Sequence, residues 1–223
     1  MEVEIGKTFV KEIMNEGKGL VFVYPPYKGT YANVAQQIES EGLVKPSSSD
    51  TASLIHEVWK NPQGEYESKI LSEFKRYWFW ELNAGNLYLP KSNEEINDGV
   101  IIEYNPYIAN GKLCMNKDSL IKRLCEDDPW VKFIPFGFKV FEQSSKELEK
   151  NAYVVARYGE EAATKIAEVA SHYKNFPNLY MPNSTDVERV TMSALDDYLC
   201  GNRLVVIGSP WFQNDGLAFG KVQ

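Results

Sequence analysis

One short turn near the start of the chain holds the residues best suited to binding a small charged ligand. Residues 20–24 are apolar and predict a buried strand, and a turn and a helix follow. A strand that leads through a glycine-containing turn into a helix presents free backbone amides and a partial positive charge. This pattern predicts a site for a small anionic ligand of an enzyme or receptor, formed by Tyr24, Tyr27, Lys28, Gly29, Thr30 and Tyr31.

The same turn also has a purely structural interpretation, which the sequence favours. Pro25 and Pro26 stiffen the turn, and Thr30 is a suitable N-cap for the helix. The phosphate-binding P-loop needs a glycine five residues before its Gly-Lys-Ser/Thr, whereas the order here is Lys28, Gly29, Thr30. The turn is therefore not a P-loop, and packing explains it without any ligand.

Histidines and aspartates are the next candidates for chemistry. Glu168 and His172 lie four residues apart on one face of a predicted helix, a spacing that suits metal ligands or a carboxylate orienting an imidazole. A catalytic metal needs about three protein ligands, and His56 is in a distant segment. Asp196 and Asp197 are adjacent, so on a strand they would point to opposite faces. We expect a surface Glu–His pair, turn aspartates, no metal and no other cofactor.

Cysteine and serine nucleophiles lack a supporting motif. Cys114, Cys125 and Cys200 have no CxxC spacing, which predicts neither a disulfide framework nor a zinc site, and buried reduced thiols are the simplest expectation. No Gly-x-Ser-x-Gly elbow is present. The sequence therefore contains no recognisable catalytic constellation, and whether the protein is an enzyme stays open.

Two groups of aromatic residues are candidates for partner binding. Trp78, Phe79 and Trp80 are consecutive, and three large rings cannot all face one side of a helix or strand, so we expect at least one to be exposed. Trp211 and Phe212 follow a proline in a polar loop, where rings either anchor a partner or fold over the core. We predict a binding or protein-interaction domain with Trp211 and Phe212 as partner-binding residues.

Composition and charge limit the classes of partner. The chain has 223 residues, 43% of them hydrophobic, and 24 basic against 31 acidic residues give a net charge of -7. Excess carboxylates repel phosphate backbones and no basic stripe compensates, so we expect no nucleic acid. No apolar run approaches the ~20 residues that span a bilayer, and the first residues do not resemble a signal peptide. We expect a soluble cytoplasmic protein that binds no membrane, and the oligomeric state is not predicted.

The order of the elements predicts an α+β fold with a mixed or antiparallel sheet. We expect one domain over residues 1–223, with a possible division near Pro129. The tail should form a C-terminal β-meander packed against several amphipathic helices. Helical spacing and caps predict helices at residues 7–16, 30–41, 50–60 and 65–77 and after Asn116, Ser144 and Gly159. Strand patterns occupy residues 19–24, 85–90, 99–104, 131–136, 188–195, 203–208 and 217–222.

Overall fold

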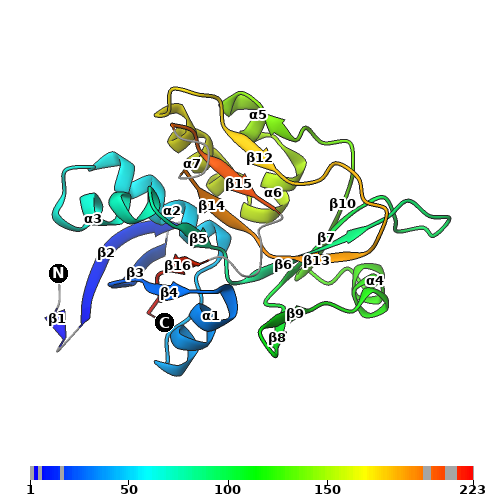
Figure 1. Cartoon of the computed structure of the whole chain (residues 1–223), viewed down its shortest axis with the longest axis horizontal. Coiled ribbons are helices and arrows are strands. Elements are labelled where there is room, and N and C mark those ends of the chain that lie inside the picture. The colour runs from blue at the N-terminus through cyan, green and yellow to red at the C-terminus, as the bar shows by residue number, and fades with distance from the viewer. Residues whose placement is uncertain (1–2, 5–6, 16–17, 198–201, 209–214, 223) are drawn as a thin grey trace.

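The α+β class is confirmed in the computed structural model of the chain, in which helices surround mixed and antiparallel sheets (Figure 1). The structure describes all residues except 1–2, 5–6, 16–17, 198–201, 209–214 and 223, and it describes only the backbone within residues 3–15. The described helices are α1 Tyr31–Ser40, α2 Ser48–Lys60, α3 Glu65–Phe74, α4 Lys117–Cys125, α5 Ser145–Glu149, α6 Ala152–Tyr158 and α7 Glu160–Ser171.

A mixed sheet of seven strands forms the centre of the molecule. Its order is β11-β12-β15-β14-β5-β16-β4, in which β12 runs parallel to β15 and β16 runs parallel to β5. All four remaining pairs in this sheet are antiparallel. The strands are β4 Tyr27–Gly29, β5 Trp78–Trp80, β11 Phe141–Glu142, β12 Asn178–Tyr180, β14 Ala194–Asp196, β15 Val205–Ile207 and β16 Gly216–Ala218.

Alternating side chains give this sheet two buried faces. Phe79, Leu195 and Val206 point into a large cluster with residues of α2, α3, α6 and α7. Their neighbours along the same strands, such as Trp80 and Ala194, pack on the other face against α1. Figure 1 shows the same layers, with α1 below strands β4 and β16 and with α2 and α3 above them. Because successive residues of a strand face opposite ways, the central strands contribute side chains to both clusters, and α1 covers the second face where it packs on β4 and β16.

A second, antiparallel sheet extends to the side of the first. Its order is β10-β7-β6-β13, and α4 covers one face through Leu120, which packs with Leu87 and Ile101. The predicted hairpin of residues 85–90 and 99–104 is confirmed as the β6–β7 pair. The strands of this sheet are β6 Ala84–Leu89, β7 Gly99–Tyr104, β10 Val131–Pro135 and β13 Arg189–Thr191, and a separate hairpin joins β8 Tyr107–Ala109 to β9 Lys112–Cys114.

The predicted helix at residues 7–16 is wrong. Strands β1 Val3–Glu4, β2 Lys7–Asn15 and β3 Lys18–Tyr24 form an antiparallel sheet instead. The register between β2 and β3 shifts between Val10 and Ile13, where a β-bulge adds a residue to β2. A bulge interrupts the two-residue period of a strand. The resulting spacing of apolar residues at 9, 10, 13 and 14 therefore imitates a helical face.

The tail contains the expected strands but not one continuous meander. Strands β14 and β15 form an antiparallel pair, as in a meander. In contrast, β13 joins the four-stranded sheet through β6, and β16 lies between β5 and β4 in the central sheet. Short apolar strands carry no sequence signal for which neighbour they take, so the C-terminal strands are distributed over two sheets.

Two helix starts were predicted correctly from local hydrogen bonding alone. Ser144 and Glu147 form the predicted capping box at the start of α5. Asn116 caps α4 by accepting from the amide of Ser119 at 2.9 Å. Capping depends on residues three apart in sequence, which is why the sequence alone reveals it.

Candidate functional site

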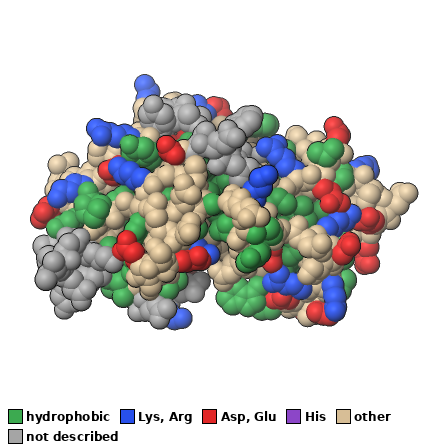
Figure 2. All heavy atoms as spheres, turned by 60° about the horizontal axis from the view of Figure 1, so that its bottom comes forward, with side chains coloured by type: hydrophobic (Ala, Val, Ile, Leu, Met, Phe, Trp, Pro, Cys, Tyr) green, Lys and Arg blue, Asp and Glu red, His purple; other side chains and the backbone are tan. Residues whose placement is uncertain are grey.

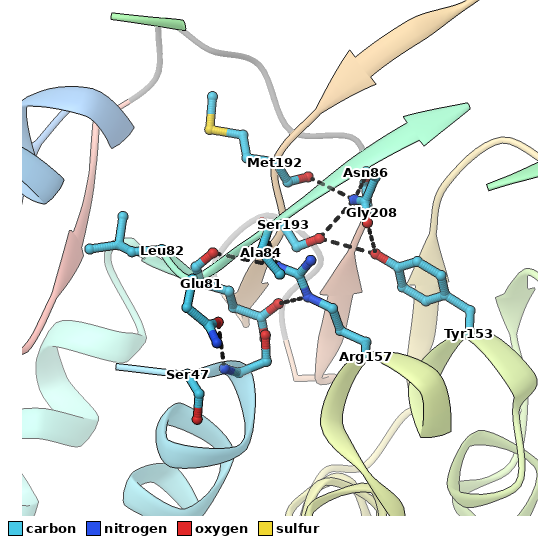
Figure 3. Close-up of polar contacts among 12 residues, drawn as sticks. Ser47, Glu81, Leu82, Ala84, Asn86, Tyr153, Arg157, Met192, Ser193 and Gly208 are labelled. Atoms are coloured by element: carbon cyan, nitrogen blue, oxygen red, sulfur yellow. Dashed lines mark hydrogen bonds and ion pairs between the residues drawn. The ribbon is translucent and has the colours of Figure 1, made fainter. Parts of the chain in front are cut away.

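A buried ion pair, drawn in Figure 3, involves the short segment that links β5 of the central sheet to β6 of the second sheet. The Nε atom of Arg157, on α6, donates to Oε2 of Glu81 at 3.1 Å, and both side chains are fully buried. Arg157 also donates through Nη2 to the carbonyl of Ala84 at 3.1 Å. Burial raises the pKa of the Glu81 carboxyl, and the Arg157 guanidinium acts in the opposite direction. Each charge depends on the other, because an unpaired buried charge is costly.

Beside this pair, three side chains converge on one backbone carbonyl. The Gly208 carbonyl accepts from the hydroxyl of Thr191 at 2.6 Å and from the hydroxyl of Tyr88 at 2.8 Å. It also accepts from Nδ2 of Asn86 at 3.0 Å. The hydroxyl of Tyr153 donates to Oδ1 of Asn86 at 3.2 Å, which fixes the amide orientation (Figure 3). All four side chains are buried, so this polar cluster holds the end of β15 in one position.

We call the residues Asn86, Tyr88, Tyr153, Thr191 and Gly208 the Gly208 network. The sequence analysis missed it. A polar residue inside an apolar strand, such as Asn86 before Leu87, and a cation inside the apolar helix α6 are the signals that were available. Burying a polar or charged side chain is costly without hydrogen-bond partners, so such residues mark polar contacts across the core.

The two groups of predicted aromatic anchors have different outcomes. Trp211 and Phe212 lie outside the described residues, which resume at Asp215. The expectation that one ring of Trp78, Phe79 and Trp80 is exposed is wrong, because their exposed fractions are 6%, 1% and 0%. Strand β5 lies inside the central sheet, and helices cover both of its faces. Opposite faces of a strand can therefore both be core.

At the predicted anion site, the side chains have partners within the protein. Nζ of Lys28 is 2.8 Å from Oε2 of Glu73 and 4.5 Å from the centre of the Tyr77 ring. The hydroxyl of Tyr27 donates to Oε2 of Glu41 at 2.8 Å. These contacts place the charge of Lys28 against a carboxylate, and the anion site stays a prediction.

The remaining residues of this turn belong to the junction of β4 and α1. Thr30 is the N-cap of α1 without a side-chain cap bond, and the Tyr31 hydroxyl donates to the carbonyl of Leu82 at 3.1 Å. The carbonyl of Gly29 accepts from Nε1 of Trp80 at 3.1 Å. The ring of Tyr24 packs edge-on against Tyr66.

A groove of about 390 Å³ runs along α1 from Ala32 to Glu39. The β8–β9 hairpin forms its other wall, with Asn110 and Gly111 at the tip in left-handed conformations. Its lining residues are Ala32, Asn33, Ala35, Gln36, Glu39, Ile108, Asn110 and Gly111. Amide side chains and a carboxylate thus surround the space, and Lys28 is not among the lining residues.

The predicted pair of Glu168 and His172 is not formed. Oε2 of Glu168 lies 2.5 Å from Nε2 of His56, on the neighbouring helix α2. His172 instead stacks on Trp59, with ring centres 5.2 Å apart. Helices α2 and α7 pack together. Glu168 therefore pairs with His56, which is 112 positions away in the sequence, rather than with His172 on its own helix.

The two adjacent aspartates are both buried at the end of β14. Tyr173 donates a hydrogen bond to Oδ2 of Asp197 at 3.2 Å. Burial raises the pKa of the Asp197 carboxyl from 3.8 to about 6, with a further contribution from Asp196. Asp196 is the last residue of β14 and Asp197 follows it directly, so the expected turn aspartates lie at the end of a strand, and Asp197 is only 7% exposed.

Within the described ranges, no three His, Cys, Asp or Glu residues are placed to hold a metal ion. Cys114 and Cys125 are exposed rather than buried, and Cys200 lies outside those ranges. No helix that the structure describes combines the length and the apolar character needed to cross a bilayer. On the face in Figure 2, basic and acidic side chains are interspersed rather than gathered into one patch.

Comparison with known proteins shows the fold and nothing finer. No protein family and no curated protein matches the sequence. The chain is similar to a solved structure described as accommodating massive sequence variation in Nanoarchaeota by the C-type lectin fold. The identity is 15% with a TM-score of 0.57, over 89% of this chain and 98% of that chain. The fold of this chain is therefore similar to the C-type lectin fold.

Proposed function

We propose that the protein is a non-catalytic binding domain that recognises a protein partner through Trp211 and Phe212. The observation that carries this proposal is the triple hydrogen bonding of the Gly208 carbonyl, two residues before Pro210. A backbone fixed at Gly208, three residues before Trp211, gives the ring-bearing segment a rigid attachment point, and preorganisation of this kind lowers the entropy lost on binding. Tryptophan is also enriched among residues that dominate binding energy.

The structural neighbour supports a binding role. That structure concerns a C-type lectin fold that accommodates massive sequence variation. A fold that tolerates such variation needs a core whose stability does not depend on the variable positions. In this chain, the Gly208 network and the Glu81–Arg157 pair join segments between 17 and 122 residues apart. Because these contacts lie within the core, its stability does not depend on the residues of the loops.

Selection from a random peptide display library tests the proposal without a known partner. The wild-type protein should enrich a family of related peptides with affinities in the micromolar range or tighter. The double variant Trp211→Ala, Phe212→Ala should bind the selected peptides at least about tenfold more weakly, since hot-spot residues contribute ~2 kcal/mol or more.

Trp130→Ala is the matched control, because Trp130 is another tryptophan and is 55% exposed. This variant should bind the selected peptides as the wild type does. If no peptide family is enriched, or if the double variant binds as tightly as the wild type, the proposal is wrong.

A small anionic ligand at the turn from Tyr24 to Tyr31 is the second candidate. The observation in its favour is that the N-cap Thr30 makes no side-chain cap hydrogen bond at the start of α1, where backbone amides can bind an anion. A panel of phosphate, nucleotides and carboxylates should then raise the melting temperature, with ~2.7 kcal/mol of stabilisation at a hundred times the dissociation constant. Lys28→Ala should abolish that shift, and Lys122→Ala on α4 should not. An unchanged melting temperature with every ligand would exclude the site.

A further inference from the structure

A pocket of about 480 Å³ beside α5 and α6 is lined by three lysines and one carboxylate. This volume is within the usual range of small-molecule sites. Its lining residues are Phe138, Lys139, Gln143, Lys146, Glu147, Lys150, Asn151 and Ala152. The charged residues of the lining leave a net positive charge, although the whole chain carries -7.

The single carboxylate of the pocket is fully engaged. Glu147 accepts from Nζ of Lys139 at 2.8 Å and from the amide and hydroxyl of Ser144 at 2.7 and 2.9 Å. Lys139 and Ser144 together lower the pKa of Glu147 to about 2. Glu147 therefore stays ionised and compensates Lys139. Within the part of the chain that the structure describes, Lys146 and Lys150 have no ion-pair partner.

Lys146 and Lys150 are placed to act together. They lie four residues apart across α5 and its C-cap, so their side chains project from the same face. Both side chains are exposed at the rim of the pocket. Two neighbouring ammonium groups without a carboxylate partner attract an anion more strongly than either group alone.

An aromatic ring forms part of the pocket wall, and the core holds it. Phe138 stacks on Tyr153, with ring centres 5.9 Å apart and planes 23° apart. Tyr153 is fully buried and belongs to the Gly208 network. The ring of Phe138 is therefore held in place by the core before any ligand arrives.

Buried amides fix the backbone on the same side of the pocket. Nδ2 of Asn151 donates to the carbonyl of Lys139 at 2.7 Å and to Oε1 of Gln143 at 3.1 Å. Asn151 and Gln143 are only 6% and 2% exposed. Phe141 lies between Lys139 and Gln143 in the sequence. Its backbone has a positive φ of 63°, which is strained for a bulky residue. Strained positions that the surroundings enforce concentrate at binding sites.

We propose that this pocket binds a small organic anion, with its apolar body against Phe138 and Ala152 and its anionic group between Lys146 and Lys150. The geometry requires both parts of the ligand. Lys146, Lys150 and Ala152 are exposed, whereas the ring of Phe138 is half-buried. An inorganic anion would use only the lysines. This binding site goes beyond the recognition of a protein partner through Trp211 and Phe212, and neither proposal depends on the other.

Fluorescence titration with anilinonaphthalene sulfonate, an aromatic sulfonate, tests the pocket in the full chain. The dye should bind with a large increase in emission. Lys146→Gln combined with Lys150→Gln should weaken binding about tenfold, because two charge-assisted hydrogen bonds are lost. Benzoate should displace the dye, whereas inorganic phosphate at the same ionic strength should not.

Two further variants separate this site from general surface binding. Ala152 is exposed at the start of α6, so Ala152→Trp should fill the pocket and prevent dye binding without loss of melting temperature. Lys122→Gln on α4 should bind the dye as the wild type does. If the double lysine variant and Ala152→Trp both keep the wild-type affinity, or if phosphate displaces the dye as well as benzoate does, the proposal is overturned.

Discussion

Arg157 on α6 and Glu81 after β5 form an ion pair at 3.1 Å between side chains that are both fully buried. A buried ion pair is not in itself a source of stability, because two charges lose their hydration. Its consequence is mutual dependence, since either charge alone would be left in the core. The pair therefore fixes how α6 docks against the segment that links the two sheets.

Removing one member of this pair should be strongly destabilising. Arg157→Met leaves the Glu81 carboxylate unpaired, and we expect a loss of about 3–5 kcal/mol in the free energy of unfolding. Glu81→Leu combined with Arg157→Met should recover much of that loss, because no charge is then buried. Urea denaturation of the three proteins measures both effects. A single variant that loses less than about 1 kcal/mol would contradict the mutual dependence of the two charges.

The stability of the protein should fall as pH rises through about 6, because burial raises the pKa of Asp197 from 3.8 to about 6. A raised native pKa means that the folded state binds the proton more tightly than the unfolded state. The resulting stabilisation is complete below pH 3.8 and is lost as Asp197 ionises near pH 6.

Asp197→Asn should remove this component. The variant should be more stable than the wild type above pH 7 by about 1–2 kcal/mol, since one pKa unit corresponds to ~1.4 kcal/mol and partial solvation reduces the effect. The measurement is urea denaturation from pH 4 to pH 8, with the exposed Asp118→Asn as control. Parallel curves for wild type and Asp197→Asn would show that Asp197 titrates normally.

Thr191→Val removes one of the three donors to the Gly208 carbonyl while keeping the shape of the side chain. The other two donors remain, so the carbonyl is still satisfied, and we expect a loss of only about 1 kcal/mol. Asn86→Leu should cost more, because its amide bonds to Gly208, Met192 and Ser193 are all lost. Thermal unfolding of both variants gives this order, and the reverse order would mean that Thr191 rather than Asn86 holds the network together.

The sequence predicted features that depend on near neighbours and failed on features that depend on contacts. The capping residues Ser144 and Asn116 act within three positions of the chain, and both were found. Asn86 and Gly208 are 122 residues apart, and no local pattern joins them. For the same reason the sequence did not reveal that Trp78 and Trp80 are buried. Their burial depends on α1 and on strands from the other end of the chain.

Of the candidate site, the sequence indicated the residue types but not their partners. Lys28 was expected in a turn before a helix, but it lies in strand β4, just before α1, and Glu73 of α3 is its ion-pair partner. His56 was set aside as distant from Glu168, and the packing of α2 on α7 brings them together. Pairing between charged groups is decided by tertiary packing, which neither periodicity nor spacing encodes.

Gly216 is a further case, because nothing near it in the sequence indicates the close contacts it makes. It lies in β16 between β5 and β4, with Trp78 and Gly29 as its partners across the sheet. A Cβ atom at this position would lie 2.6 Å from Nε1 of Trp80 and 2.7 Å from the carbonyl oxygen of Trp78. Trp80 is fully buried and donates to Gly29, so its ring has no room to move away.

Gly216→Ala should therefore lower the free energy of unfolding by about 1–3 kcal/mol through overpacking. Gly19→Ala is the matched control, since Gly19 is an exposed strand glycine with nothing within 4 Å of the added Cβ. The control should change stability by less than about 0.5 kcal/mol. Urea denaturation of both variants measures the difference. A neutral Gly216→Ala would contradict the close approach of β16 to Trp80.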